Sequence, residues 1–532
     1  MASEQTETER TYEGPALPAG LEALPGVAAA HGAEPQELDA RYYDTPDLRL
    51  LRHGITLRRR TGGSDPGWHV KLPLGADSRQ EVHVPLDAGN RHQVPGELAA
   101  RLAAFTRGTA LIPVARLRTH RVRTHLLDRE RRILAEITED RVAAQAFEPE
   151  PDPAAPAQAG QGAPPASAGG GATTRADGWT EFEVELEHGT PALLEHIDAH
   201  LTAAGLTRSP WPSKLARALG RSDAPPAGPP AGTGRARSAG DVVLHGLRTQ
   251  LDRLLVLDGA VRRGEEDSVH QLRITARRLR SLLKAHRRLF DDRRSEPLAS
   301  RLRWLARLLG EARDQEVLSD QLVDALSAVP APMREGALRA RITAHYAATY
   351  RAARQHVITE LDGARYFGLL DDLEAFVARP PLRRRARRSA DDYLAGALRR
   401  EQRRTLRRLD QALDTPEGPA RDEALHRARK AAKRARYTAE DARPAVGRRT
   451  GERLGRYAKR MRKLHKVLGT QHDSVVACQA LVRLGTRAEA ERRHLFAYGV
   501  LYEVQRRVGE DALDRLPRLR RRAARSKLTR MP

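Results

Sequence analysis

The hydrophobic residues of this chain follow two different periods. In seven segments before residue 190, apolar and polar residues alternate with a period of two, and turn residues separate the segments. This alternation is typical of β-strands with one buried face, and it predicts strands at residues 6–14, 54–62, 68–74, 79–86, 120–128, 132–145 and 179–189. From residue 239 onward, apolar residues recur every three or four positions, which predicts amphipathic helices. We therefore expect an α+β chain, with a β-rich domain followed by a helical one.

Charged residues gather on one face of each predicted strand. Glu7 and Glu9 share a face, as do Arg58 and Arg60, and the segment at 179–189 carries glutamates at alternate positions. The pattern continues in two further strands, with the pairs His69 and Lys71, and Glu81 and His83. A solvated outer face would explain any one strand, but acids on some strands and bases on others favour a closed barrel with a charged lumen.

Two of the predicted helices carry a cationic stripe beside their apolar face. The stripes run at spacings of three and four residues, and they consist of His270, Arg273, Arg277, Arg280 and Lys284 in one helix and of His426, Arg429, Lys433 and Arg436 in the other. The two helices align without a gap, and two later segments align in the same order, with Asp314 over Asp473. Matches in the same order indicate a duplication. We expect two similar helical bundles that face one another, with both stripes on a shared groove.

The charge is distributed unequally between the two parts of the chain. Within a formal net charge of +24, residues 1–220 carry about −6 and residues 221–532 carry about +30. A domain that cationic repels itself unless a polyanion or counterions bind it, so nucleic acid, an anionic membrane and inorganic polyphosphate are the candidate partners. Aromatic residues make up only 4% of the chain, which argues against single-stranded nucleic acid because stacking platforms are few.

Two segments rich in Pro, Ala and Gly lack any hydrophobic period. Residues 148–176 are predicted to be a disordered insert in the first domain, and residues 221–238 are predicted to be the linker. The predicted domains are therefore residues 1–220 and 239–532.

The chain shows no sign of an exported or membrane-spanning protein. Cys478 is the single cysteine, so neither an intrachain disulfide nor a thiolate-rich zinc site is expected. The first residues are acidic and unlike a signal peptide, and no run of about 18 apolar residues occurs. We expect a cytoplasmic protein.

These residues carry a resemblance to two families. Together with the opening glutamates, the segments "YYDTPDLRLLRHGITLRRR", "WHVKLP", "EFEVELE" and "SKLARAL" resemble the CYTH, or triphosphate tunnel, domain over about residues 3–220. The two histidine–arginine helices and the segments "LLGEARDQEVL" and "VLGTQHDSVVA" resemble the CHAD domain over about residues 239–525. The tandem order is typical of such proteins.

The CYTH resemblance implies an eight-stranded tunnel that binds a triphosphate and one or two Mg²⁺ or Mn²⁺ ions. By position, the metal ligands would be Glu7 and Glu9, supported by Glu183 and Glu185, and the catalytic group would be Glu7, Glu9 and Lys71. Phosphate oxygens would be bound by Arg58, Arg60, Lys71, Lys214 and one arginine of the strand around residue 120, either Arg118 or Arg121. Carboxylate oxygens suit Mg²⁺ or Mn²⁺, and no cluster of His and Cys indicates zinc.

One departure from the CYTH pattern bears on activity. The family opens with Glu-x-Glu-x-Lys, whereas this chain has Glu7, Glu9 and then Thr11. A hydroxyl in place of an inward ammonium removes one phosphate contact. The expected chemistry is in-line attack of a metal-polarised water on a terminal phosphorus, and the substitution leaves the rate of this step open.

The CHAD resemblance implies that the stripe residues bind inorganic polyphosphate and that the protein associates with polyphosphate granules. At about 1.5 Å per residue, the stripe from His270 to Lys284 spans roughly 21 Å, which is long enough to follow several phosphates. No acidic residue lies between Asp267 and Asp291, which disfavours the alternative of a solvated helix face paired with acids.

Several functions stay open on this basis. The leading hypothesis is a metal-dependent triphosphatase whose helical domain tethers polyphosphate, and the rival is a non-catalytic polyphosphate-binding scaffold. The same kind of tunnel also carries thiamine triphosphatase and adenylate cyclase activities, and a nucleic-acid binder is a weaker option. The cluster from Arg383 to Arg388 is either a loop between the bundles or part of the polyanion surface.

Overall fold

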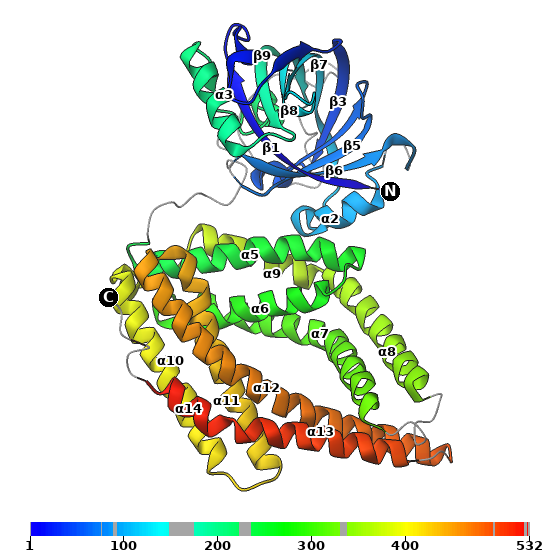
Figure 1. Ribbon diagram of the computed structural model, residues 1–532, viewed down its shortest axis with the longest axis vertical. Coiled ribbons are helices and arrows are strands. Elements are labelled where there is room, and N and C mark those ends of the chain that lie inside the picture. The colour runs from blue at the N-terminus through cyan, green and yellow to red at the C-terminus, as the bar shows by residue number, and fades with distance from the viewer. Residues whose placement is uncertain are drawn as a thin grey trace, which may run out of the picture. The chain divides into compact units, whose positions relative to one another are not determined.

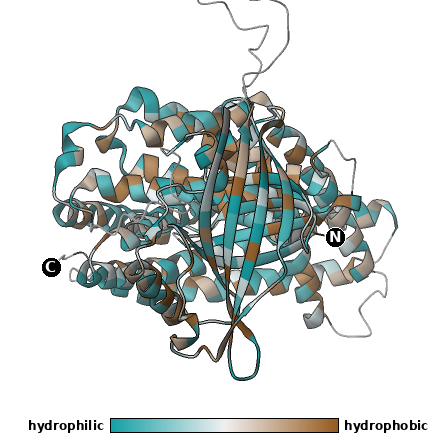
Figure 2. Ribbon diagram, turned by 90° about the horizontal axis from the view of Figure 1, so that it is seen from above, coloured by the Kyte–Doolittle hydropathy of each residue, from teal (hydrophilic) through white to brown (hydrophobic). Residues whose placement is uncertain are grey.

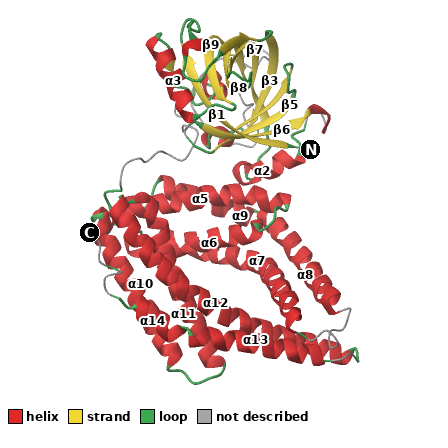
Figure 3. Cartoon of the chain, in the orientation of Figure 1, coloured by secondary structure: helices red, strands yellow, loops and turns green. Residues whose placement is uncertain are grey.

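The computed structural model of the chain describes residues 2–75, 77–88, 93–147, 175–222, 236–329, 338–492, 495–525 and residue 529. The chain divides into two compact units, one running to Gly232 and the other starting at Thr233. The first unit is built mainly of strands and the second of helices (Figure 3). The two periods of the sequence thus correspond to two kinds of structure, and the predicted fold class is confirmed.

In the described part of the first unit, eight antiparallel strands close into a barrel (Figure 1). Around the barrel the order is β1 (Ser3–Glu13), β6 (Ser78–Pro85), β5 (Gly67–Pro73), β4 (Thr56–Thr61), β3 (Gln36–Asp44), β7 (Ile112–Leu127), β8 (Ile133–Ala146) and β9 (Arg175–Leu186). β9 pairs with β1, with Glu185 opposite Glu9, and this pairing closes the ring. Two short strands extend the sheet, β2 (Ala29–Gly32) beside β7 and β10 (Thr207–Arg208) beside β1.

The alternation of side chains along the strands separates an apolar layer from a charged lumen. Hydrophilic and hydrophobic residues succeed one another along the strands in Figure 2. On the outer face, helix α3 (Pro191–Ala203) packs Leu194 and Ile197 against Phe182 and Val184 of β9. Helices α1 (Arg49–Arg52) and α2 (Gly96–Thr106) also belong to this unit.

Helix α4 (Lys214–Ala218) fills one end of the lumen. Its residues Leu215 and Ala216 pack against Tyr42, Leu117 and Val142, which lie on the lumen face of their strands. The hydroxyl of Ser213 accepts a hydrogen bond from the backbone N–H of Ala216 and so caps the helix. Because Lys214 is the first residue of this helix, its side chain is held at the inner end of the lumen.

Strand β3 was not among the seven segments that the alternation predicted. Leu38, Ala40 and Tyr42 are buried at alternate positions, but Tyr43 and Asp44 are buried as well. Asp44 is buried because its carboxylate accepts hydrogen bonds from the backbone N–H groups at the start of α1. Burial of consecutive residues hides the period of two at this end of the strand.

The helices of the second unit repeat one order twice. The first round is α5 (Ala239–Arg263), α6 (Ser268–Ala285), α7 (Asp292–Ala325), α8 (Leu338–Leu361) and α9 (Ala364–Ala378). The second round is α10 (Ala390–Leu413), α11 (Pro419–Ala442), α12 (Arg448–Ala490), α13 (Phe496–Asp514) and α14 (Leu516–Ala523). A short 3₁₀ helix follows both α6 and α11, at Arg287–Leu289 and at Arg443–Ala445. The repeated order, including these turns, is what a duplication produces, and the two rounds meet where α5 and α6 pack against α10 and α11.

The predicted insert and linker lie mostly outside the described residues. Strand β9 begins at Arg175, just before the predicted end of the insert, and α5 begins at Ala239 with Ser238 as its N-cap. Among the helices that the structure describes, none combines the length and the apolar character needed to cross a membrane.

Candidate functional site

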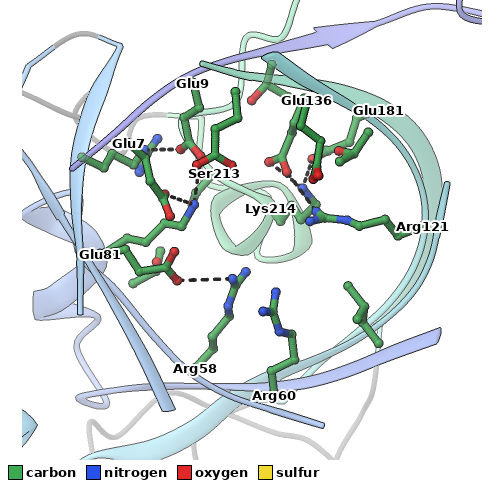
Figure 4. Close-up of a pocket in the computed structure, with 18 of the residues that line it drawn as sticks. Glu7, Glu9, Arg58, Arg60, Glu81, Arg121, Glu136, Glu181, Ser213 and Lys214 are labelled. Carbon is green, nitrogen blue, oxygen red and sulfur yellow. Dashed lines mark hydrogen bonds and ion pairs between the residues drawn. The ribbon is translucent and has the colours of Figure 1, made fainter. Parts of the chain in front are cut away.

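The barrel encloses a cavity of about 220 Å³ whose walls are mostly ionisable side chains. Figure 4 shows them pointing toward one another across the lumen. The acidic group includes Glu7, Glu9, Glu81, Glu136, Glu181, Glu183, Glu185 and Glu187, and the cationic group consists of Arg58, Arg60, Lys71, Arg79, Arg121, Arg123 and Lys214.

Glu7 and Glu9 on β1 meet cations from β5 and β6. The Nζ atom of Lys71 lies 2.7 Å from Oε2 of Glu7 and 2.9 Å from Oε2 of Glu9. On the other side of Glu9, the Nε atom of Arg79 lies 2.6 Å from Oε1. Burial opposes the ionisation of Glu9, but Lys71 and Arg79 hold its pKa below the usual range. Glu9 is therefore a carboxylate at neutral pH.

Two neighbouring carboxyl groups are less acidic. Burial, and after it Glu81, raises the pKa of Glu7 to about 7. Burial, and after it Glu7, raises the pKa of Glu185 to about 8. Glu185 is the cross-strand neighbour of Glu9, and like charges placed opposite one another repel. At neutral pH the carboxyl groups of Glu7 and Glu185 are therefore protonated in part.

A second acid–base cluster lies where α4 enters the lumen. The Nζ atom of Lys214 lies 3.0 Å from Oδ2 of Asp140, 2.7 Å from Oε1 of Glu181 and 2.6 Å from Oε1 of Glu183. Arg121 donates to both oxygens of Asp140, at 2.7 and 2.6 Å, and to Glu183 at 3.1 Å. Burial opposes the ionisation of Glu183, but Lys214 and Arg121 hold its pKa well below the usual range.

Arg58 and Arg60 of β4 form a cationic wall. Arg58 lies 3.6 Å from Glu81, and Arg60 forms an ion pair with Asp65. Burial, and after it Arg58, lowers the pKa of Arg60 to about 10. Burial also lowers the pKa of His69 to about 4, so its ring is neutral beside Glu81. An anion between the two arginines would relieve their mutual repulsion.

The structure separates the two arginines of β7 that the resemblance left as alternatives. Arg118 and Arg121 are three residues apart, so their side chains point to opposite faces of the strand. Arg121 lines the cavity. Arg118 is exposed and lies opposite Asp39 in the strand register, outside the residues that line the cavity. Arg118 is therefore corrected from a phosphate ligand to a residue of the outer face.

Several lumen residues had been given no role from the sequence. They are Arg79, Glu81, Arg123, Glu136 and Glu181. The signal for three of them is their spacing, because Arg123, Arg79 and Glu181 each lie two positions from a residue already placed on the lumen face. The remaining predicted tunnel residues (Glu7, Glu9, Arg58, Arg60, Lys71, Glu183, Glu185 and Lys214) all line the cavity.

The donor chemistry of the acidic wall fits a hard divalent cation. Carboxylate oxygens are the ligands that Mg²⁺ and Mn²⁺ prefer, and the carboxyl groups of Glu7 and Glu9 both line the cavity. Within the described residues, no three His, Cys, Asp or Glu side chains gather as the ligands of one ion. Lys71 lies between Glu7 and Glu9 instead. A divalent cation at these glutamates would compete with Lys71 for the same oxygens.

The two cationic stripes of the helical unit act on each other's charge. Burial, and then Arg277 and Arg429, lowers the pKa of Lys433 well below its usual value. Burial, and then Arg273, lowers the pKa of Arg277 to about 10, and Arg429 adds to this effect. Charges perturb one another this strongly only at close range. The stripes of α6 and α11 thus lie close to one another where the two helices pack, and the shared groove stays a prediction.

The histidines within and beside the stripes are neutral at pH 7. Burial, followed by Lys433 and Arg429, lowers the pKa of His465 to about 2. Burial, followed by Lys430, lowers the pKa of His426 to about 4, and its ring centroid lies 4.2 Å from that of His472. His472 is therefore part of this packed layer.

The duplication is visible in the contacts of single residues. Arg273 of α6 lies 2.8 Å from Asp314 of α7, and Arg429 of α11 lies 3.7 Å from Asp473 of α12. The glycine four residues before each aspartate leaves room for the arginine. A Cβ atom there would lie 3.3 Å from Nη2 of Arg273 in one round and 3.6 Å from Nε of Arg429 in the other.

Comparisons with known proteins agree with this division of the chain. The CYTH domain family matches residues 17–219, and the CHAD domain family matches residues 245–482. Two uncharacterized proteins from the CDC 1551 and H37Rv strains of Mycobacterium tuberculosis are each 35% identical over 500 residues, which cover 93% of this chain and 91% of theirs. The chain belongs to the family of tandem CYTH–CHAD proteins.

Solved structures resemble part of the chain, with TM-scores below 0.5. PptA from Streptomyces chartreusis has a TM-score of 0.43 at 20% identity, covering 53% of this chain and 99% of that one. The CHAD domain from the plant Ricinus communis has a TM-score of 0.43 at 25% identity, covering 55% of this chain and 94% of that one.

Both families are known for ligands that are phosphate chains. The CYTH family includes triphosphatases and cyclases, and CYTH tunnel enzymes generally depend on a divalent metal. CYTH and CHAD domains in general bind triphosphates and polyphosphate. The charged cavity lies in the CYTH domain, and the two facing stripes lie in the CHAD domain.

Proposed function

We propose that the CYTH barrel hydrolyses a triphosphate with Mg²⁺ or Mn²⁺, and that the CHAD domain binds inorganic polyphosphate. The observation that supports hydrolysis is the cavity itself, in which carboxylates from β1 and β9 share one lumen with guanidinium groups from β4 and β7. The carboxylates alone would repel a triphosphate, and the guanidinium groups alone would repel a metal ion. A complex of metal and triphosphate is matched by both.

The cationic residues bind and orient the phosphate chain. Arg58, Arg60 and Arg121 stay charged and pair with non-bridging phosphate oxygens, and Lys214 reaches the chain from the closed end of the lumen. They neutralise the charge that develops on these oxygens as the terminal P–O bond breaks during in-line attack by water.

The acidic residues hold the divalent cation. Glu7 and Glu9, with Glu183 and Glu185 from the closing strand, would supply its carboxylate ligands. When bound, the ion supplies Lewis-acid polarisation of phosphoryl and water oxygens. Lys71 is placed at the boundary between the two walls, where it can exchange carboxylate partners for phosphate oxygens.

The facing stripes support polyphosphate binding by the CHAD domain. Cations that lower one another's pKa are destabilised as charges, and a linear polyanion along both stripes restores their charged form. The stripes need no metal for this function, since most of their residues are arginines, which keep their charge. Through this binding the protein would associate with polyphosphate granules in the cytoplasm.

A non-catalytic polyphosphate-binding scaffold is the second candidate, and Thr11 favours it. Thr11 lines the cavity opposite Glu183, where the family has a lysine. Arg10 does not replace that ammonium, because its guanidinium contacts Asp77 and Glu195 outside the lumen.

Phosphate release by the purified full chain tests the proposal. The substrates are tripolyphosphate, long polyphosphate, ATP and thiamine triphosphate, each with Mg²⁺ or Mn²⁺. We expect release from tripolyphosphate with metal and none with EDTA. Preference for thiamine triphosphate, or formation of cyclic AMP from ATP, would reassign the tunnel to another activity of its family. Retained polyphosphate binding without release from any substrate would establish the scaffold.

A further inference from the structure

A second cationic pocket lies in the CHAD domain, where the first round of helices meets the second. Its volume is about 200 Å³, close to the 220 Å³ of the barrel cavity. The end of α6, the 3₁₀ turn after it, the segment around the 3₁₀ helix Arg384–Arg387 and helix α10 line this α6–α10 pocket. Its cationic side chains are Lys284, Arg287, Arg288, Arg385, Arg388, Arg400 and Arg404.

Carboxylates neutralise only some of these cations. Lys284 lies 3.6 Å from Glu296, which is not among the residues that line the α6–α10 pocket. The pocket itself has two acidic residues. They are Asp392 and Glu401, and Glu401 is already engaged, accepting hydrogen bonds from Arg404 at 3.0 Å and from Arg434 at 2.7 Å. In the part of the chain that the structure describes, no carboxylate forms an ion pair with the arginines Arg287, Arg288, Arg385, Arg388 and Arg400. A concave surface with such an excess of positive charge attracts anions.

The α6–α10 pocket also has a fixed, uncharged side. Tyr393 lines it, and the Tyr393 hydroxyl oxygen lies 2.8 Å from Nδ1 of the buried His286. Burial, and then Arg400, lowers the pKa of His286 to about 3, and burial raises the pKa of Tyr393 to about 12. The imidazole and the phenol are both neutral, so they orient one another and add no negative charge to the pocket.

We propose that the α6–α10 pocket binds a terminal phosphoryl group, which presents three non-bridging oxygens. The stripe residues lie along one face of a helix, which suits internal phosphates with two such oxygens each. In the α6–α10 pocket, cations instead approach from separate segments of the chain, and guanidinium forks from several sides match an end group. Lys284 belongs to both the stripe and the pocket, so a phosphate chain that follows α6 can end there.

The cluster from Arg383 to Arg388 was interpreted from the sequence either as a loop between the bundles or as part of the polyanion surface, and under this proposal it is both. Arg384–Arg387 form the 3₁₀ turn between the two rounds of helices, and Arg385 and Arg388 line the α6–α10 pocket. The bound phosphoryl group can belong to a free small phosphate or to the end of a polyphosphate. Binding of a polyphosphate end rests on the proposed function of the CHAD domain, whereas binding of a free small phosphate does not.

Calorimetric titration of the full chain with inorganic pyrophosphate, without metal, tests the proposal. The double variant Arg288→Glu/Arg388→Glu is compared with Arg448→Glu/Arg507→Glu, which makes the same charge change at exposed arginines outside the pocket. All proteins carry Arg58→Gln, so that the barrel contributes less binding. We expect the affinity to fall at least about tenfold in the pocket variant and to stay unchanged in the control. The milder Arg388→Gln should show a smaller loss in the same direction.

Two further ligands identify what the pocket binds. Trimetaphosphate is cyclic and has no terminal phosphoryl group, so its affinity should be the same for the pocket variant and the control. A loss of long-polyphosphate affinity in the pocket variant would identify a chain end as the source, and an unchanged affinity would identify a free small phosphate. The proposal is overturned if the pyrophosphate affinity survives the charge reversal in the pocket variant. It is also overturned if the trimetaphosphate affinity falls as much as the pyrophosphate affinity. Neither outcome depends on whether the CHAD domain binds polyphosphate.

Discussion

Lys71 shows how closely the charges of the lumen depend on one another. Its ammonium lies within 2.9 Å of both Glu7 and Glu9. Burial opposes its charge, but Glu9, Glu81 and Glu7 hold the pKa of Lys71 well above the usual value. A metal ion that binds the carboxylates of Glu7 and Glu9 displaces Lys71 from them. The ammonium of Lys71 then needs another anion, and a phosphate oxygen of the proposed substrate can provide it. Metal and triphosphate are therefore expected to bind together.

The raised pKa values of Glu7 and Glu185 predict the pH dependence of metal binding. A carboxyl group must lose its proton before it ligates a metal ion. With pKa values of about 7 and about 8, these two groups are protonated below that range, so Mn²⁺ affinity should rise through it and level off above. Titration of free Mn²⁺ by electron paramagnetic resonance measures this. Glu185→Gln should lose the upper part of the rise, and a flat affinity in the parent would contradict the assignment.

Thr11→Lys should raise the turnover of tripolyphosphate. Position 11 lines the cavity opposite Glu183, so the substitution restores an ammonium beside the phosphate chain. A single well-placed cation contributes on the order of tenfold or more to such a reaction. Thr11→Val is the control, because it removes the hydroxyl without adding charge, and it should give no gain. An unchanged rate in Thr11→Lys would mean that Lys214 and Arg121 already supply the missing charge.

At the scale of single elements, the face on which a strand residue lies could be predicted, but its partner could not. The alternation is local, so Arg58, Arg60 and Glu183 were placed correctly on the lumen side of their strands. Lys71 lies on β5, and β6 separates β5 from β1, so the order of the strands in the sheet brings Lys71 to Glu7 and Glu9. The choice between Arg118 and Arg121 stayed open because the resemblance identified the strand and not its register.

The helical stripes could be predicted more completely. A stripe needs only the helical period, and the internal duplication supplied the second copy. What the sequence could not show is that burial and the facing stripe depress the charge of Lys433 and Arg277. That effect depends on the packing of α6 against α11.

Reversing the stripes should abolish polyphosphate binding. The variant Arg273→Glu/Arg277→Glu/Arg429→Glu/Lys433→Glu should lose at least about 100-fold in affinity, because adjacent phosphates lose charge-assisted hydrogen bonds and meet repulsion. The matched control places glutamate at four exposed positions, Arg448, Arg507, Arg518 and Arg521. Fluorescence anisotropy with labelled polyphosphate in EDTA measures both. An equal loss in the two variants would indicate a response to net charge alone.

Polyphosphate binding should draw protons onto the CHAD domain. Because the pKa of Lys433 is lowered, part of the Lys433 side chains are neutral at pH values below the usual pKa of lysine. A bound polyanion raises the pKa of Lys433 again. Proton uptake follows, and calorimetry in buffers of different ionisation enthalpy measures it. Lys433→Arg should reduce the uptake, since arginine keeps its charge. Proton release, or an uptake unaffected by this change, would contradict the arrangement of the stripes.

At the scale of the whole molecule, each domain has its own hydrophobic core. The cluster around Phe182 and the cluster around Tyr42 lie within the CYTH domain, and the clusters around Tyr457 and Tyr498 lie within the CHAD domain. Substitutions in separate cores and sites usually act independently. The stripe variant is therefore expected to keep its triphosphate turnover, and tunnel variants are expected to keep polyphosphate binding.

The central claim is that the carboxylates of the CYTH barrel support metal-dependent hydrolysis. Its most direct test is phosphate release from tripolyphosphate with saturating Mn²⁺, measured for the parent, for Glu9→Gln and for the control Glu37→Gln, whose side chain is exposed on β3. We predict that Glu9→Gln lowers the rate at least about 100-fold, because it removes a charged ligand from the lumen, while Glu37→Gln stays at the parent rate. A rate that survives Glu9→Gln, or that persists in EDTA, would contradict the claim.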